Sequence, residues 1–172
     1  MKTITVHIIT RASPEFDTLR WVLRARGDDP TRMVLQCLHV DGDRTVVATD
    51  GRRMHYTDPL PGLDLAPGTY EVLGMDESEI HLTPHDGVYP HWRAVIPQTD
   101  KQEELKAAET SIYVADIFAK AQTYIQHNYI FDALMREESS VMLNWKSDGD
   151  GLEAIRLDVA HGHAVIMPLR RQ

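Results

Sequence analysis

Apolar and polar residues alternate along the first ten positions of the chain. This period of two predicts a half-buried strand over residues 3–9, with Ile4, Val6 and Ile8 on its buried face.

A helical pattern follows this strand. Phe16, Leu19 and Leu23 are spaced to share one face, Ser13 is placed to cap the helix, and Gly27 is placed to end it. The spacing therefore predicts an amphipathic helix between Ser13 and Gly27.

The pattern then changes to short strands. Residues 33–40 are predicted as a strand that turns at Asp41-Gly42 into a second strand over residues 44–50. A corner at Asp50-Gly51 leads into a third strand over residues 52–57, because glycine accepts the positive φ that such corners need.

Residues 58–68 carry three prolines and two glycines, which predicts a loop. Short strands are expected over residues 69–75 and 79–84. The polar stretch from residue 97 to residue 109 suits either a surface excursion or a short helix.

A second helix is predicted to begin near Ser111 and to continue to Met135, with a break at Asn128. Its apolar stripe consists of Val114, Ile117, Phe118, Ala121 and Ile125. Strands follow over residues 141–145, 152–159 and 163–169, with turns over residues 147–151 and around Gly162.

This order of elements predicts an α+β fold of two similar βαβββ halves, with two helices packed on antiparallel sheets. The 172 residues suit one domain over residues 1–172, divided into a first half (1–88), a junction (89–110) and a second half (111–172).

Composition limits the classes of function. A net charge of −8 argues against a surface devoted to nucleic acid, and a single cysteine, Cys37, excludes a disulfide framework within the chain. The alternating start does not have the pattern of a signal peptide, and no window is apolar enough for a membrane span. We therefore expect a cytoplasmic protein without membrane contact.

Three separated segments resemble the bacterial DNA sliding clamp, the beta subunit of DNA polymerase III. Residues 31–54 contain Ala-Thr-Asp-Gly-Arg-Arg-Met at positions 48–54, close to the family's A-T-D-G-H-R-L. Residues 89–97, YPHWRAVIP, are similar to F-P-D-Y-R-R-V-I-P, and residues 164–170, AVIMPLR, to V-V-M-P-M-R. The family's His is Arg52 here, and one of its arginines is Ala94.

The resemblance implies a clamp-like fold and a shallow apolar pocket that binds short linear peptides of polymerases, the clamp loader and repair proteins. Carried over by position, the pocket residues are Leu35, Thr49, Gly51, Arg52, Arg53, Met54, Pro90, Val95, Val165, Met167, Pro168 and Leu169. The same apolar side chains also suit ordinary core positions on strands.

The resemblance also suggests contact with duplex DNA that does not depend on base sequence. The residues that would face DNA are Arg20, Arg24, Arg26 and Lys120. A clamp chain has three domains and closes a ring as a dimer, so encirclement by this chain would need about six copies, by analogy with the family's six-domain ring. A homo-oligomer is therefore one alternative, solvated surface charges another, and an adaptor or decoy that does not embrace DNA a third.

Candidate metal ligands are His161 and His163 near Asp158, or His81 with His85, but neither group has a third ligand at diagnostic spacing. No nucleophile or phosphate-binding motif is present, and the carboxylates are scattered. The sequence therefore predicts a non-enzymatic binding protein without cofactor or metal, and a small enzyme is the remaining alternative.

Overall fold

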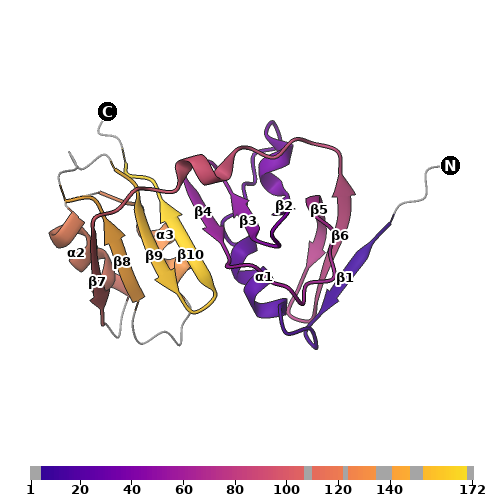
Figure 1. Ribbon diagram of the computed structural model, residues 1–172, viewed down its shortest axis with the longest axis horizontal. Helices are drawn as coiled ribbons and strands as arrows, with labels where there is room; N and C mark the ends of the chain where they lie inside the picture. Colours follow the sequence, from indigo (N-terminus) through magenta and orange to yellow (C-terminus); the bar gives the residue numbers. More distant parts are fainter. Residues whose placement is uncertain (1–4, 107–109, 122–123, 135–140, 148–152, 170–172) are drawn as a thin grey trace. The chain divides into compact units, whose positions relative to one another are not determined.

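The computed structural model describes residues 5–106, 110–121, 124–134, 141–147 and 153–169. The chain forms two compact units, Met1–Pro90 (unit 1) and His91–Gln172 (unit 2), and each is described by itself. Both are α+β, as predicted (Figure 1).

Unit 1 is one antiparallel sheet covered by a helix. Its elements are β1 (His7–Thr10), α1 (Phe16–Leu23), the 3-10 helix η1 (Met33–Gln36), β2 (Leu38–Val40), β3 (Val46–Thr49), β4 (Arg53–Tyr56), β5 (Gly68–Met75) and β6 (Glu79–His85). The strand order is β1-β6-β5-β2-β3-β4. α1 packs on β3, β4 and β6.

The core of unit 1 forms because α1 is apolar around most of its circumference. Phe16, Leu19 and Leu23 are buried as predicted, and Trp21 and Val22 are buried beside them. Ile80 and Leu82 of β6 and Leu38 of β2 supply buried residues of the sheet. Burial of each large apolar side chain contributes roughly 1.5–3 kcal/mol.

Unit 2 is a four-stranded antiparallel sheet with two α-helices. Its elements are η2 (Trp92–Val95), β7 (Lys101–Leu105), α2 (Thr110–Ala121), α3 (His127–Ala133), β8 (Val141–Trp145), β9 (Ile155–Val159) and β10 (Gly162–Ile166). The strand order is β10-β9-β8-β7. Its core contains Leu105, Ile117, Ile130, Leu143 and Leu157.

The buried face of the first strand differs from the prediction. Val6 and Ile8 are 44% and 52% exposed, and Ile9 is buried instead. Ile9 lies opposite the buried Ile80 of β6, whereas Ile8 lies opposite His81. The alternation was misleading because apolar residues occupy both faces of this strand; Ile4 lies outside the described residues.

The start and end of α1 also differ from the prediction. Glu15, not Ser13, is the N-cap, and no side chain caps the helix; the Ser13 carbonyl accepts a bond from the Phe16 N–H instead. The helix ends at Leu23, and Gly27 lies beyond it, where its N–H donates to the Leu35 carbonyl over 2.8 Å.

Two further predictions in unit 1 need correction. Residues 33–36 form η1 rather than the start of a strand, so only Leu38–Val40 are extended. The hairpin at Asp41-Gly42 is present, but the positive φ (72°) is at Arg44 and not at Gly42. Arg44 is held in this conformation by bonds from its guanidinium to the carbonyls of Leu63 and Leu65.

In unit 2, the stretch predicted as an excursion or a helix contains β7, which pairs with β8 along its whole length. The helical region divides into α2 and α3 between residues 121 and 127, so Asn128 lies inside a helix rather than at a break. Phe118, predicted as core, is exposed. The side chain of Val114 and residues 148–151 of the predicted turn lie outside what the structure describes.

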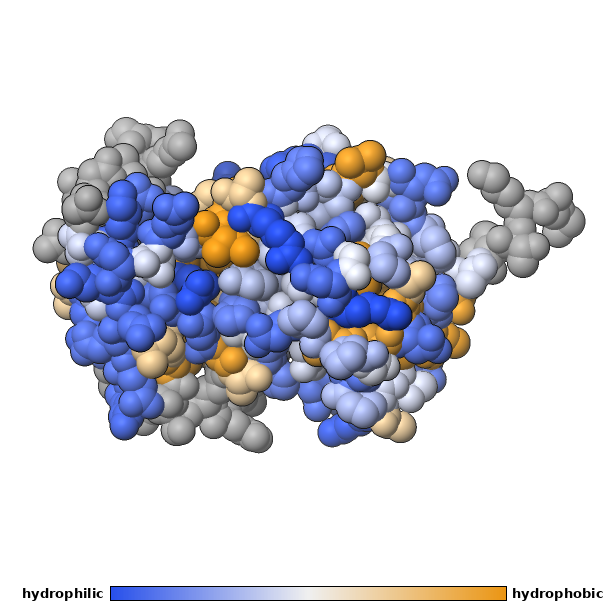
Figure 2. All heavy atoms as spheres, viewed as in Figure 1, coloured by the Kyte–Doolittle hydropathy of each residue, from blue (hydrophilic) through white to orange (hydrophobic). Residues whose placement is uncertain are grey.

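The surface on the viewed side is largely hydrophilic in both units, with separate apolar patches (Figure 2). None of the described helices is long and apolar enough to cross a membrane.

Candidate functional site

The corner between β3 and β4 is held by two side chains. The Thr49 hydroxyl donates to the Arg53 carbonyl over 2.6 Å and accepts a bond from the Gly51 N–H. The Asp50 carboxylate accepts bonds from the backbone N–H groups of Arg52 and Arg53 at 2.8 and 2.9 Å. Gly51 has a φ of +88°, so the predicted glycine corner is confirmed.

Three arginines surround this corner. Arg53 places its Nε 3.2 Å from the Asp50 carboxylate and is only 11% exposed, whereas Arg52 is exposed. Arg32 lies against Gly51: a Cβ added there would be 3.1 Å from its guanidinium nitrogens. Arg32 is not among the residues predicted for the site, although the segment that carries the resemblance contains it.

The apolar residues predicted near this corner differ in exposure. Leu35 in η1 and Met54 in β4 are buried, whereas Pro90 is exposed. A Cβ added at Gly27 would lie 3.5 Å from the Leu35 Cβ and 3.6 Å from the Asp50 Cα, so η1 lies close to the corner. Unit 1 therefore presents a corner of backbone and arginine side chains over a buried apolar base.

The predicted residues of unit 2 lie mainly on one segment after β10. Val165 is buried, Pro168 is half-buried, and Met167 and Leu169 are 37% and 44% exposed. Val95, at the end of η2, is also exposed.

An aromatic pair that the sequence did not predict lies next to this segment. The Leu169 N–H donates to the Tyr124 carbonyl over 2.7 Å, and the Tyr124 ring lies 4.6 Å from the ring of Phe118. Both rings are exposed. Helical spacing assigns Phe118 to a core stripe, so the pattern gave no signal for an exposed aromatic pair.

Unit 1 thus brings Thr49, Gly51, Arg52, Arg53 and Met54 together at one corner with Leu35 nearby, and unit 2 brings together Val165, Met167, Pro168 and Leu169. The conclusion that both sets line one pocket stays a prediction.

The basic residues predicted to face DNA have other contacts. The Arg20 guanidinium lies 5.6 Å from the centre of the Phe16 ring, and Lys120 pairs with Glu103 at 2.5 Å. Arg24 is exposed and Arg26 half-buried. An acidic partner reduces the positive potential that Lys120 can offer to a phosphate.

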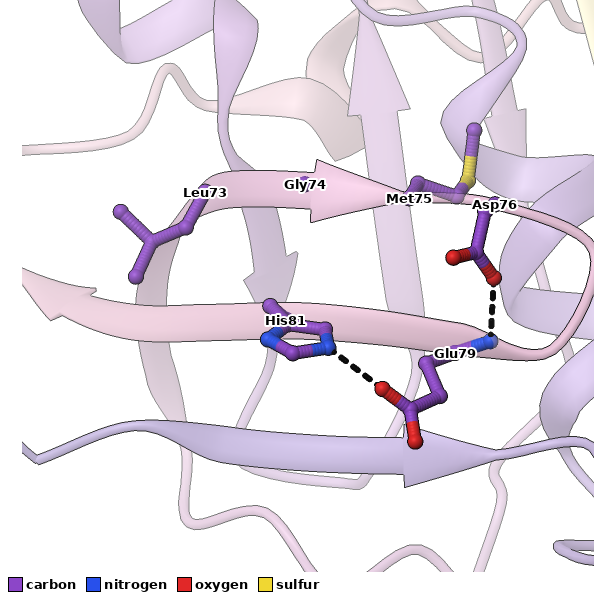
Figure 3. A pocket seen from close by; sticks show the side chains of 6 residues that line it. All are labelled: Leu73, Gly74, Met75, Asp76, Glu79 and His81. Atoms are coloured by element: carbon purple, nitrogen blue, oxygen red, sulfur yellow. Dashed lines mark hydrogen bonds and ion pairs between the residues drawn. The ribbon is translucent and has the colours of Figure 1, made fainter.

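The candidate metal ligands are bound to other groups. His81 donates to the Glu79 carboxylate over 2.8 Å (Figure 3), and His85 accepts a bond from the Gly87 N–H. Within the described ranges, no three His, Cys, Asp or Glu side chains are grouped to hold a metal ion.

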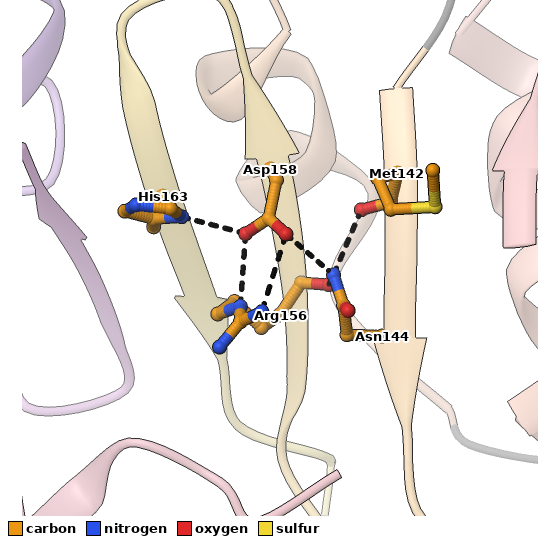
Figure 4. Close-up of polar contacts among 5 residues, drawn as sticks. All are labelled: Met142, Asn144, Arg156, Asp158 and His163. Atoms are coloured by element: carbon orange, nitrogen blue, oxygen red, sulfur yellow. Dashed lines mark hydrogen bonds and ion pairs between the residues drawn. The ribbon is translucent and has the colours of Figure 1, made fainter. Parts of the chain in front are cut away.

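Asp158 is the centre of a polar network on β8, β9 and β10 (Figure 4). It accepts bonds from His163 Nδ1 at 2.6 Å, from Arg156 Nε at 2.8 Å and from Asn144 Nδ2 at 2.8 Å. Partial burial raises the pKa of this carboxyl, but the bonds from His163 and Arg156 outweigh burial and hold the pKa below its usual value. Arg156 Nη2 also donates to this carboxylate at 3.2 Å, and four donors on one carboxylate indicate a structural role.

Neither a protein-family model nor a curated protein matches the sequence. Among solved structures, the chain is similar to the DNA polymerase III beta subunits of Borrelia burgdorferi (13% identity, TM-score 0.63) and Caulobacter crescentus (14%, 0.64), and to the sliding clamp of Bacillus subtilis (14%, 0.61). These similarities cover 96%, 99% and 100% of this chain, and 65%, 68% and 67% of those chains. The chain therefore spans about two thirds of their length, slightly less for the first. The predicted clamp resemblance is confirmed for the fold.

Proposed function

Because the chain has the fold of the bacterial sliding clamps, we propose that it is a non-enzymatic, clamp-like protein that binds short linear peptide motifs of replication or repair proteins. The observation that carries the proposal is that the chain keeps this fold together with the corner at Gly51 and the exposed Met167 and Leu169, the positions at which the sequence resembles the family.

The chemistry of the two sets suits a peptide with apolar anchors and a polar or acidic group. Met167 and Leu169 offer flexible apolar contacts for leucine or phenylalanine anchors. Arg52 is exposed beside the corner and can pair with a carboxylate. Two anchors contribute roughly 1.5–3 kcal/mol each before ordering costs, so we expect modest affinity for a single peptide.

The test is a fluorescence titration of a labelled clamp-binding peptide against wild type, Met167→Ala, Arg52→Ala and the double variant. Each single change should weaken binding about fivefold to tenfold. Phe131→Ala removes an exposed apolar side chain from α3, outside the proposed site, and should leave the affinity unchanged.

The two residues are tested separately with the same peptide, and the double variant measures whether their effects on the binding free energy add. A shorter peptide that lacks the acidic group should be insensitive to Arg52→Ala and still sensitive to Met167→Ala. Equal binding by wild type and Met167→Ala, or no binding by wild type, contradicts the proposed function.

A second candidate is an adaptor that binds peptides without embracing DNA. The Lys120–Glu103 pair favours it, because the carboxylate reduces the positive potential that Lys120 can offer to phosphates. The two alternatives differ in assembly. A processivity factor should form a large defined oligomer retained on circular DNA, whereas an adaptor should be a monomer or dimer by light scattering, without DNA affinity at moderate salt.

A further inference from the structure

The outer face of β1 and the β5–β6 hairpin combines exposed apolar side chains with an unpaired strand edge. In the described part of unit 1, β1 pairs with β6 on one side only. Val6 and Ile8 are exposed on or next to this strand, and Leu73 is exposed at the irregularity in β5. We call this set the β1 edge surface. Exposed apolar edges are uncommon in soluble proteins unless they bind something.

The backbone of β1 is oriented to accept another strand. The Arg11 N–H donates to the Ser78 carbonyl, and the antiparallel register runs without a break from Thr10 to His7. Hydrogen-bonded pairs alternate along such a ladder, so Ile9 and His7 face β6, and the backbone groups of Ile8 face away from it. At Thr10 the carbonyl already accepts a bond from the Ser13 N–H, which leaves the Thr10 N–H for an added strand. The apolar Ile8 therefore lies where an added strand would hydrogen-bond.

A shallow pocket of about 210 Å³ lies on the β5–β6 hairpin. Its lining includes Leu73, Met75 and His81, and His81 is the register partner of Ile8. Figure 3 shows that the Leu73 and Met75 side chains come from one strand, and that His81 and Glu79 come from the neighbouring one. The pocket is large enough for one aliphatic side chain of a partner.

The rim of this surface is acidic. Glu71, Asp76 and Glu77 are exposed, and Glu79 is half-buried beside His81. A second copy that paired through its own β1 would bring another acidic rim onto the same sheet, and the chain already carries a net charge of −8. A basic partner neutralises this rim instead.

We propose that the β1 edge surface binds an extended segment of a partner protein in which apolar and basic side chains alternate, as an added strand beside β1. Backbone bonds to Ile8 and to the Thr10 N–H supply the pairing, one apolar side chain enters the pocket at Leu73 and His81, and the basic side chains face the acidic rim. This surface is separate from the residues of the proposed peptide site.

The experiment is a fluorescence anisotropy titration of the full chain with a labelled nine-residue peptide of alternating isoleucine and lysine. A peptide of the same composition in block order and a peptide of alternating isoleucine and glutamate are the controls. Only the alternating isoleucine–lysine peptide should bind, and salt should weaken its binding. Equal binding of the block-order peptide would show nonspecific charge attraction and overturn the proposal.

Variants locate the binding. Ile8→Ser should weaken it about tenfold, since it removes one apolar contact. Met167→Ala should have no effect, so that failure here is distinguishable from failure of the proposed peptide site. The double change Glu71→Lys and Glu77→Lys should weaken binding of the lysine peptide and create binding of the glutamate peptide. Both glutamates are exposed, so this double variant should fold even if the Ile8→Ser variant does not fold.

Light scattering at the titration concentrations tests whether a second copy of the chain occupies the β1 edge surface. A monomer that stays monomeric with peptide bound supports the proposal. A dimer that Ile8→Ser dissociates would show that a second copy covers the surface, and would overturn it.

Discussion

His55 should make unit 1 sensitive to mild acid. It lies fully buried on β4, stacked on Trp21 with ring centres 4.4 Å apart, and its Nδ1–H donates to the Trp21 carbonyl over 2.9 Å. Its Nε2 has no hydrogen-bond partner in the described part of the chain. A proton added at Nε2 would therefore create a buried charge without an acceptor.

Burial lowers the pKa of His55 from 6.5 to about 3, and the positive charges of Arg53 and Arg24 act in the same direction, against the bond to Trp21. The folded protein thus binds this proton less tightly than the unfolded chain does. The contribution of neutral His55 to the free energy of unfolding is complete above pH 6.5. It is lost as pH falls, until the folded state also takes up the proton near pH 3. Linkage gives a loss of about 2 kcal/mol between pH 7 and pH 5, and about 5 kcal/mol below pH 3.

The assay is urea unfolding at pH 7 and pH 5, followed by far-UV circular dichroism. His55→Phe keeps a ring against Trp21 but cannot be protonated. Between these pH values its free energy of unfolding should therefore fall by about 2 kcal/mol less than that of wild type. His91→Phe changes an exposed histidine and should behave like wild type. Equal losses in wild type and His55→Phe, or an NMR titration of His55 with a midpoint near 6.5, would refute the reasoning.

Three further predictions follow from the geometry. Gly51→Ala should destabilise the protein by about 1 kcal/mol in thermal unfolding, because the φ of +88° and the nearby Arg32 both disfavour a Cβ. Gly42→Ala, where a Cβ would have nothing within 4 Å, should not change the stability. Equal effects of the two changes would contradict this prediction. Asp158→Asn should cost about 1–2 kcal/mol at pH 7. This difference should shrink as pH falls toward the lowered pKa of Asp158, and a difference that does not depend on pH would exclude the charge as its cause. Burial raises the pKa of Cys37 to about 11, so this thiol should react with a disulfide reagent at pH 8 far more slowly than the same thiol in urea, and similar rates would show that it is accessible.

The sequence predicted the elements whose signal is local and correctly placed most strands, but it did not predict the buried face of a strand that has apolar residues on both faces. Phe16, Leu19 and Leu23 were assigned correctly because helical spacing places them on one side of α1. In β1, apolar residues stand on both faces, and pairing with β6 selects Ile9. β7 was missed because four of its five side chains are exposed and polar, and only pairing with β8 makes it a strand.

The two Asp-Gly pairs show why the candidate site was more predictable at some residues than at others. At positions 50–51, Asp50 accepts the next backbone N–H groups and glycine takes the positive φ, so the local sequence determines the corner. At positions 41–42 the positive φ moves to Arg44, whose guanidinium reaches two carbonyls about twenty residues away. The same kind of distant contact brings Arg32 to Gly51 and joins Leu169 to Tyr124. Motif resemblance therefore identified the residues of the corner and of the final segment, whereas the side chains that surround them depend on contacts between segments that no local pattern encodes.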